Sequence, residues 1–125
     1  MRLALTAVVS VCLLLAPGLG RAGPAEPGFV PGVEDLPLMP GLTVPTNGAI
    51  VFDQPEGRIV ESSAQGDVAA DAINAFYTQT LPQLGWHAAG SGRWARDGER
   101  LEITATRDGA GSRAETLVRF ILRPQ

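Results

Sequence analysis

His87 is the only histidine in the 125 residues, and its side chain is the one best suited to acid–base chemistry near neutral pH. With a neighbouring carboxylate or hydroxyl it could serve a small hydrolase or isomerase, and this function is one of the alternatives. Ser62 and Ser63 do not lie in a Gly-x-Ser-x-Gly turn before a helix, so an activated serine is not indicated. We therefore expect His87 to be an exposed strand residue, and we predict no catalytic residues and no enzymatic activity.

Metal and cofactor sites are not predicted either. Cys12 is the only cysteine, and with a single histidine it cannot complete a zinc site. Asp67 and Asp71 lie four residues apart, but no further ligand is close in sequence, and capping of a helix explains them better. Residues 18–23 fit Gly-x-Gly-x-x-Gly without the preceding strand that a dinucleotide site requires.

Arginines surround Trp94, and this segment is the most suggestive binding surface in the sequence. Arg93 and Arg96 flank the tryptophan, and Arg100 follows shortly after. Arginine beside an exposed indole is a common recognition surface for anions or proteins. The alternative is a tryptophan packed on the core beneath the stems of the arginines. We take these four residues as candidate binding residues and leave the alternative open.

The charge of the chain excludes one class of partner. The sequence has ten basic residues, all of them arginine, thirteen acidic residues and a net charge of -3. A nucleic-acid-binding protein needs a clustered positive field to meet the phosphates. We therefore predict no nucleic-acid partner.

Residues 1–22 have the layout of a secretory signal peptide. A positive start at Arg2 precedes an apolar run from Leu3 to Ala16, and small residues for cleavage after Ala22 or Ala25 follow. The run is short for a membrane-spanning helix, so a retained anchor is the less favoured alternative. Cleavage would remove Cys12 and leave a soluble periplasmic or secreted protein without a stable membrane anchor.

Residues 23–48 are rich in proline and glycine and show no helical or alternating apolar period. We expect a partly extended arm there. Several of its residues between Val33 and Val44 are apolar, more so than a solvated linker needs, so this segment could lie across the domain or a partner.

Residues 49–125 are predicted to form a single domain. Alternating or β-rich segments predict strands at 49–53, 58–63, 86–89, 93–96, 99–106 and 116–123. Helical spacing of apolar residues predicts one helix from Asp67 to about Leu81. The order ββαββββ indicates an α+β fold, an antiparallel sheet of five to six strands with one helix packed on a face.

Two strand registers follow from the pattern. A turn at 54–57 sets Asp53 opposite Arg58 and Val51 opposite Val60. In the last two strands we predict pairs whose numbers sum to 221, with Leu101 opposite Phe120 and Glu102 opposite Arg119.

The other face of this last pair would then carry Leu117 and Ile121. Two apolar side chains there would suit the arm or a second subunit, and we take both as candidate binding residues.

A pattern in small uncharacterised exported proteins of Gram-negative bacteria resembles three segments of this chain: Gly57-Arg58-Ile59-Val60-Glu61, then Ala75-Phe76-Tyr77, then Leu81-Pro82-Gln83-Leu84-Gly85-Trp86. In these proteins a Phe-Tyr-x-x-x-Leu-Pro-x-x-Gly-Trp segment carries a helix into a strand. A fainter likeness is to the helix-grip domains of the assembly lipoprotein BamC, whose lipid-bearing cysteine this chain lacks. Both likenesses imply an α+β domain, and neither implies a catalytic residue.

The sequence thus favours an exported, non-catalytic binding or protein-interaction module without a cofactor, whose partner is another envelope protein or a second copy. The alternatives are the hydrolase or isomerase based on His87 and a structural envelope component that self-associates.

Overall fold

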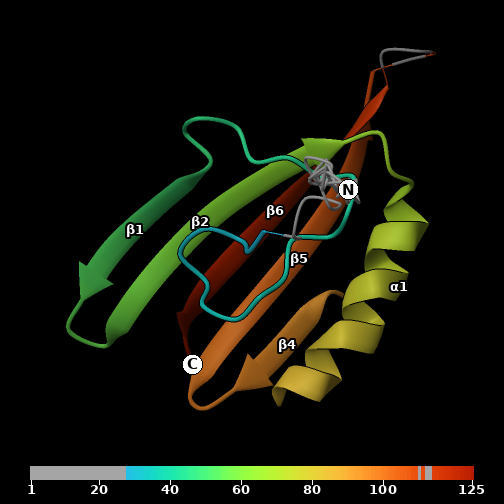
Figure 1. The fold of residues 1–125 in the computed structure, drawn as a ribbon. Coiled ribbons are helices and arrows are strands. Elements are labelled where there is room, and N and C mark those ends of the chain that lie inside the picture. Colours follow the sequence, from blue (N-terminus) through green and yellow to red (C-terminus); the bar gives the residue numbers. More distant parts are fainter. Residues whose placement is uncertain (1–27, 110, 112–113) are drawn as a thin grey trace, which may run out of the picture.

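The computed structural model describes residues 28–109, 111 and 114–125, and these form one antiparallel sheet of six strands with one α-helix (Figure 1). The order of the elements is ββαββββ, so the α+β prediction is confirmed. The predicted signal peptide, residues 1–22, lies outside the described residues together with Cys12.

The strands lie side by side in the order β1-β2-β6-β5-β4-β3. Their bounds are β1 Ala49–Gln54, β2 Gly57–Gly66, β3 His87–Ala88, β4 Arg93–Arg96, β5 Glu99–Asp108 and β6 Glu115–Pro124. The last strand of the chain therefore lies in the middle of the sheet, between β2 and β5. The connection from β2 to β3 crosses from one side of the sheet to the other and contains the helix (Figure 1).

The hairpins of the sheet agree with the local turn signals. In β1 and β2, Asp53 lies opposite Arg58 and Val51 opposite Val60, which confirms the predicted register. Between β4 and β5, Asp97 and Gly98 both have positive φ, 49° and 78°. Two such residues form the tight turn whose twist matches the flanking strands.

The predicted register of β5 and β6 is wrong by two residues. Leu101 lies opposite Leu122, and Glu102 lies opposite Ile121 rather than Arg119. A shift of two keeps every side chain on its own face of the sheet, so the alternating pattern fits both registers equally well. Arg119 instead approaches Glu61 of β2, with 3.8 Å between guanidinium and carboxylate.

The helix α1, Ala70–Thr80, continues into a short 3₁₀ turn, Leu81–Leu84. Ile73 and Tyr77 are its buried residues. The turn ends at Gly85, whose φ of 87° suits a residue without a side chain. The helix ends in the region that the sequence indicated but begins three residues later than predicted.

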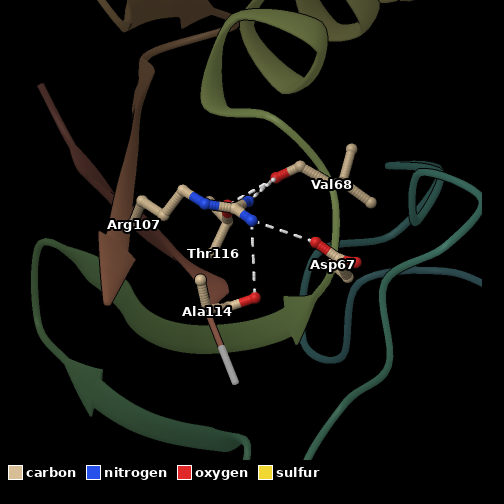
Figure 2. A network of polar contacts seen from close by, with 5 residues as sticks. All are labelled: Asp67, Val68, Arg107, Ala114 and Thr116. Carbon is tan, nitrogen blue, oxygen red and sulfur yellow. Dashed lines mark hydrogen bonds and ion pairs between the residues drawn. The ribbon is translucent and has the colours of Figure 1, made fainter. Parts of the chain in front are cut away.

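Asp67 does not cap the helix, contrary to the sequence-based expectation. The N-cap is Ala69, in extended conformation and without a side-chain cap, so Asp67 lies two residues too early to reach the free helical N–H groups. Figure 2 shows where its carboxylate binds instead, 3.1 Å from the Arg107 guanidinium. Arg107 also donates to Thr116 Oγ1 at 3.3 Å, and the Thr116 hydroxyl donates to the carbonyl of Val68. This network ties the entry of the helix to β5 and β6.

Gly28 to Gly48, the described part of the predicted arm, packs across the domain. Val30, Val33, Leu36 and Leu42 are buried in the same core as the sheet. The Tyr77 hydroxyl of α1 donates to the carbonyl of Pro37 at 2.9 Å. The folded core thus includes residues that precede Ala49, although the sequence pattern predicted a domain that begins at Ala49.

The arm and the helix lie on the same side of the sheet and cover one of its two faces (Figure 1). We call this side the covered face and the other the open face. On the covered face, Val60, Leu101, Val118 and Phe120 have no exposed surface. Tyr77 packs edge-on against Phe120, with ring centroids 5.5 Å apart. Most of the free energy of burial is therefore contributed on this side.

Candidate interaction surface: the open face of the sheet

The open face consists of the side chains that alternate with the buried ones along each strand. In β6, Val118, Phe120 and Leu122 point to the core, so the residues between them point outward. The strand registers then place the following side chains on this face: Ile50, Phe52, Ile59, Glu61, Arg93, Arg100, Glu102, Leu117, Arg119, Ile121 and Arg123. The buried residues of the described helix and arm all belong to the core of the covered face.

One part of the open face is apolar. Ile50 and Phe52 of β1 are 52% and 50% exposed, and Phe52 lies opposite the partly exposed Ile59 of β2. Leu117 on β6 is 40% exposed but lies opposite Gln65, apart from these neighbours of β1 and β2. Side chains of this size are usually exposed singly in a monomer, whereas the apolar residues of β1 and β2 are direct neighbours.

The other part of the open face is rich in arginine, and it also holds Glu102, which lies opposite Arg93. Arg100 of β5 and Arg123 of β6 lie directly opposite each other, and Arg93 of β4 lies one row away. Among the described residues, neither an ion pair nor a hydrogen bond engages Arg100 or Arg123. Like charges in directly opposed positions destabilise a sheet. The pair thus concentrates positive charge on a chain whose net charge is -3.

The structure separates the six candidate binding residues into two groups. Arg93, Arg100, Leu117 and Ile121 lie on the open face. Trp94 and Arg96 lie on the covered side, and Trp94 is only 8% exposed. The candidate patch of arginines around an exposed indole is therefore wrong, because alternate residues of one strand point to opposite faces. The alternative, a tryptophan packed on the core, is what the structure has.

Arg96 has a structural role in the covered layer. Its guanidinium donates to Asp35 of the arm at 2.8 Å and to the carbonyl of Leu84 at 2.9 Å. It also lies over the ring of Trp86, 4.4 Å from the ring centroid. The hydrogen bond to Asp35 raises the pKa of Arg96 above its ordinary value. Arg96 therefore joins the arm to the 3₁₀ turn and is not free for a ligand.

Sequence reasoning missed Ile50, Phe52, Arg119 and Arg123 as surface residues of one face. The strand pattern did contain the signal, because the residues between buried positions of each strand share a face. What the sequence lacked was the order of the strands. Because β2 and β6 are adjacent strands, the apolar residues of β1 and β2 lie beside the arginines of β5 and β6.

The residues considered for catalysis or metal binding are not brought together with suitable partner groups. His87 is exposed in the edge strand β3, opposite Ala95, and because Ala95 lies opposite Arg100 this register places His87 on the open face. It makes no hydrogen bond to the carboxylates or hydroxyls of the described residues. Residues 28–109, 111 and 114–125 also contain no group of three His, Cys, Asp or Glu side chains suited to a metal ion. In the same ranges, no helix is long and apolar enough to cross a membrane.

Two hollows lie on the covered side of the sheet. An open groove of about 700 Å³ lies along Phe29–Asp35 of the arm, with Arg58 and Leu84. A cleft of about 530 Å³ lies between α1 and strands β3 to β5, and Tyr77, Ser91 and Trp94 line it. Burial raises the pKa of Tyr77 to about 12, so its phenol stays protonated near neutral pH. The cleft therefore offers no general base from this side chain.

No protein-family model, curated protein or solved structure matches this chain. The resemblance of residues 75–86 to small exported proteins therefore stays a prediction.

Proposed function

We propose that this chain is an exported, non-catalytic protein-interaction module, periplasmic or secreted, that binds an envelope protein through the open face. The observation that carries the proposal is the unpaired arrangement of Arg100 opposite Arg123, beside the exposed apolar residues of the same face. A partner with an acidic and partly apolar surface fits this arrangement.

Arg100 and Arg123 place two guanidinium groups on neighbouring strands. Cross-strand pairs of like charge are destabilising by up to about 1 kcal/mol. No ion pair among the described residues engages either arginine, and the nearest acidic row of the open face holds Glu102. Carboxylates of a partner would form charge-assisted, bidentate hydrogen bonds with arginine. Binding would thus convert an unfavourable pair into the charged centre of an interface.

Three large apolar side chains of the open face, those of Ile50, Phe52 and Leu117, expose 40% to 52% of their surface. Most other large apolar side chains of the described residues are buried in the core of the covered face, and Phe29 and Val51 are the exposed exceptions. Interfaces combine a desolvated apolar part with a polar rim, and arginine and aromatic residues are enriched in them. The open face has both components side by side.

The experiment is a quantitative crosslinking capture from periplasmic extracts of the source cells. The bait is the wild-type protein or the double variant Arg100→Gln with Arg123→Gln. The control bait carries Ala72→Glu and Gln79→Glu, two exposed helix positions away from the open face. Both variants lower the net charge by two, so they differ only in which surface is changed.

We expect an acidic envelope protein that the wild type and the helix variant capture equally and that the arginine variant captures at least about tenfold less. Equal capture by all three baits would contradict the proposal, as would the recovery of no envelope protein by the wild type.

A further inference from the structure

The strand β1 is a free edge of the sheet, and its backbone groups have a defined direction. The Ser63 N–H of β2 donates to the Gly48 carbonyl, and hydrogen bonding alternates along an antiparallel pair. Residues 50, 52 and 54 therefore point their backbone groups toward β2. The N–H and C=O groups of Ala49, Val51 and Asp53 point to the open edge, where no described residue bonds to them.

This edge lacks the features with which sheet proteins usually prevent pairing. Over its six residues β1 has no proline, no lysine or arginine and no bulge, its register with β2 is continuous, and its one charged residue is Asp53, next to the turn. Ile50, Val51 and Phe52 are each about half exposed. The opposite edge, β3, has only two residues, His87 and Ala88. A two-residue strand presents few backbone groups, so the two edges differ in their capacity to pair.

The edge is complementary to itself. A two-fold axis perpendicular to the sheet at Val51 sets Val51 opposite Val51 of a second copy, and Ala49 opposite Asp53. These are the residues whose backbone groups point outward, so the pair would form about six hydrogen bonds. On the open face, Ile50 would meet Phe52 of the other copy, the aromatic–β-branched kind of pair that stabilises sheets. Asp53 would meet alanine, so no two like charges face each other.

We propose that two copies of this chain pair antiparallel through β1, centred on Val51, and form one continuous sheet of twelve strands. Three half-exposed side chains per copy bring together an apolar area well below the ~800 Å² per partner of a standard interface. The dimer should therefore be weak, with a dissociation constant on the order of 10–100 μM. This proposal does not rest on the acidic partner, because it concerns the purified protein alone.

The first test is sedimentation velocity of the purified protein without the predicted signal peptide, from about 1 to 500 μM. The wild type should shift from monomer to dimer in this range. Val51→Lys places two like charges at the axis, and Val51→Pro removes an outward N–H without breaking a bond to β2. Both variants should stay monomeric at the highest concentration while retaining the circular dichroism spectrum of the wild type.

The matched control is Ala88→Lys, which places the same charge on the other edge strand. It should dimerise like the wild type. A wild type that stays monomeric throughout, or a dimer that Val51→Lys does not weaken, would overturn the proposal. A dimer lost on Leu117→Asp but kept in Val51→Lys would overturn it too, because association would then occur through the open face.

The second test concerns the register. Opposed Cα atoms of a hydrogen-bonded antiparallel pair are about 5.5 Å apart, which a disulfide can span. A protein that lacks the predicted signal peptide, residues 1–22, also lacks Cys12, so its Val51→Cys variant would carry the only thiol. It should oxidise to a covalent dimer at least about tenfold faster than Asp53→Cys, whose two copies lie about 14 Å apart in this register. Equal rates would refute the pairing at Val51.

Discussion

The two faces of the sheet differ sharply although the same strands supply both. In β6, Phe120 has no exposed surface, and its sequence neighbour Arg119 lies on the open face. The difference arises from what covers each side, because α1 and the arm add a second layer on one face only. The side chains of the covered face therefore contribute most of the free energy of unfolding, whereas those of the open face contribute little. This contrast predicts the effects of substitutions on each face.

The largest expected effect is a truncation on the covered face. Phe120→Ala removes a fully buried ring that packs against Tyr77, and it should lower the free energy of unfolding by about 3–5 kcal/mol. Leu117→Ala, three residues earlier on the open face, should cost less than about 1 kcal/mol. Urea unfolding followed by circular dichroism measures both values. Similar losses in the two variants would contradict the division into a stabilising and a free face.

An intermediate effect concerns alkaline pH. Tyr77 is the only tyrosine, and burial on the covered side raises its pKa from 10.0 to about 12. The folded state therefore keeps a proton that the unfolded state loses in this window. Stability should be unaffected below pH 10 and fall by about 2 kcal/mol as the pH rises to 12.

The chain has no lysine, so no side-chain amine obscures this window. Urea unfolding of the wild type and of Tyr77→Phe across it checks the prediction, because the variant should lack the alkaline decline. Between pH 10 and about 11, absorbance of the tyrosinate should rise strongly in the unfolded protein and little in the folded one. Parallel pH profiles in the two proteins would count against a buried, proton-retaining phenol.

The smallest expected effect has the opposite sign. Replacing Arg100 and Arg123 together by glutamine removes two like charges from opposed positions and should raise the free energy of unfolding by about 0.2–1 kcal/mol. The gain should shrink in high salt, which screens exposed charges. The variant that loses partner capture would then be more stable than the wild type. A clear destabilisation would instead indicate that these arginines support the fold.

The sequence predicted the parts of the fold that depend on local patterns. The β1–β2 hairpin was placed in its correct register because a short turn fixes which residues oppose each other. For β5 and β6 the connection is longer, and the alternating pattern could not distinguish registers two residues apart. The apolar residues between Val33 and Val44 indicated that the arm could lie across the domain, and the structure has it there. Which of its residues are buried could not be predicted, because the proline-rich sequence has no period.

The candidate site was only partly predictable. Leu117 and Ile121 were assigned to the second face of their strand, and the structure places both on the open face. Trp94 was grouped with Arg93 by proximity in sequence, although neighbouring residues of a strand point in opposite directions. The pairing of Arg100 with Arg123 depends on the order and register of strands, which no local pattern contains.

The central position of β6 has a consequence for the biogenesis of the protein. This strand is the only one that pairs with both β2 and β5, although it follows all the other strands in the chain. A nascent polypeptide in which β6 is still inside the ribosome has two parts of a sheet with nothing to join them. Such a chain cannot close its core until β6 emerges.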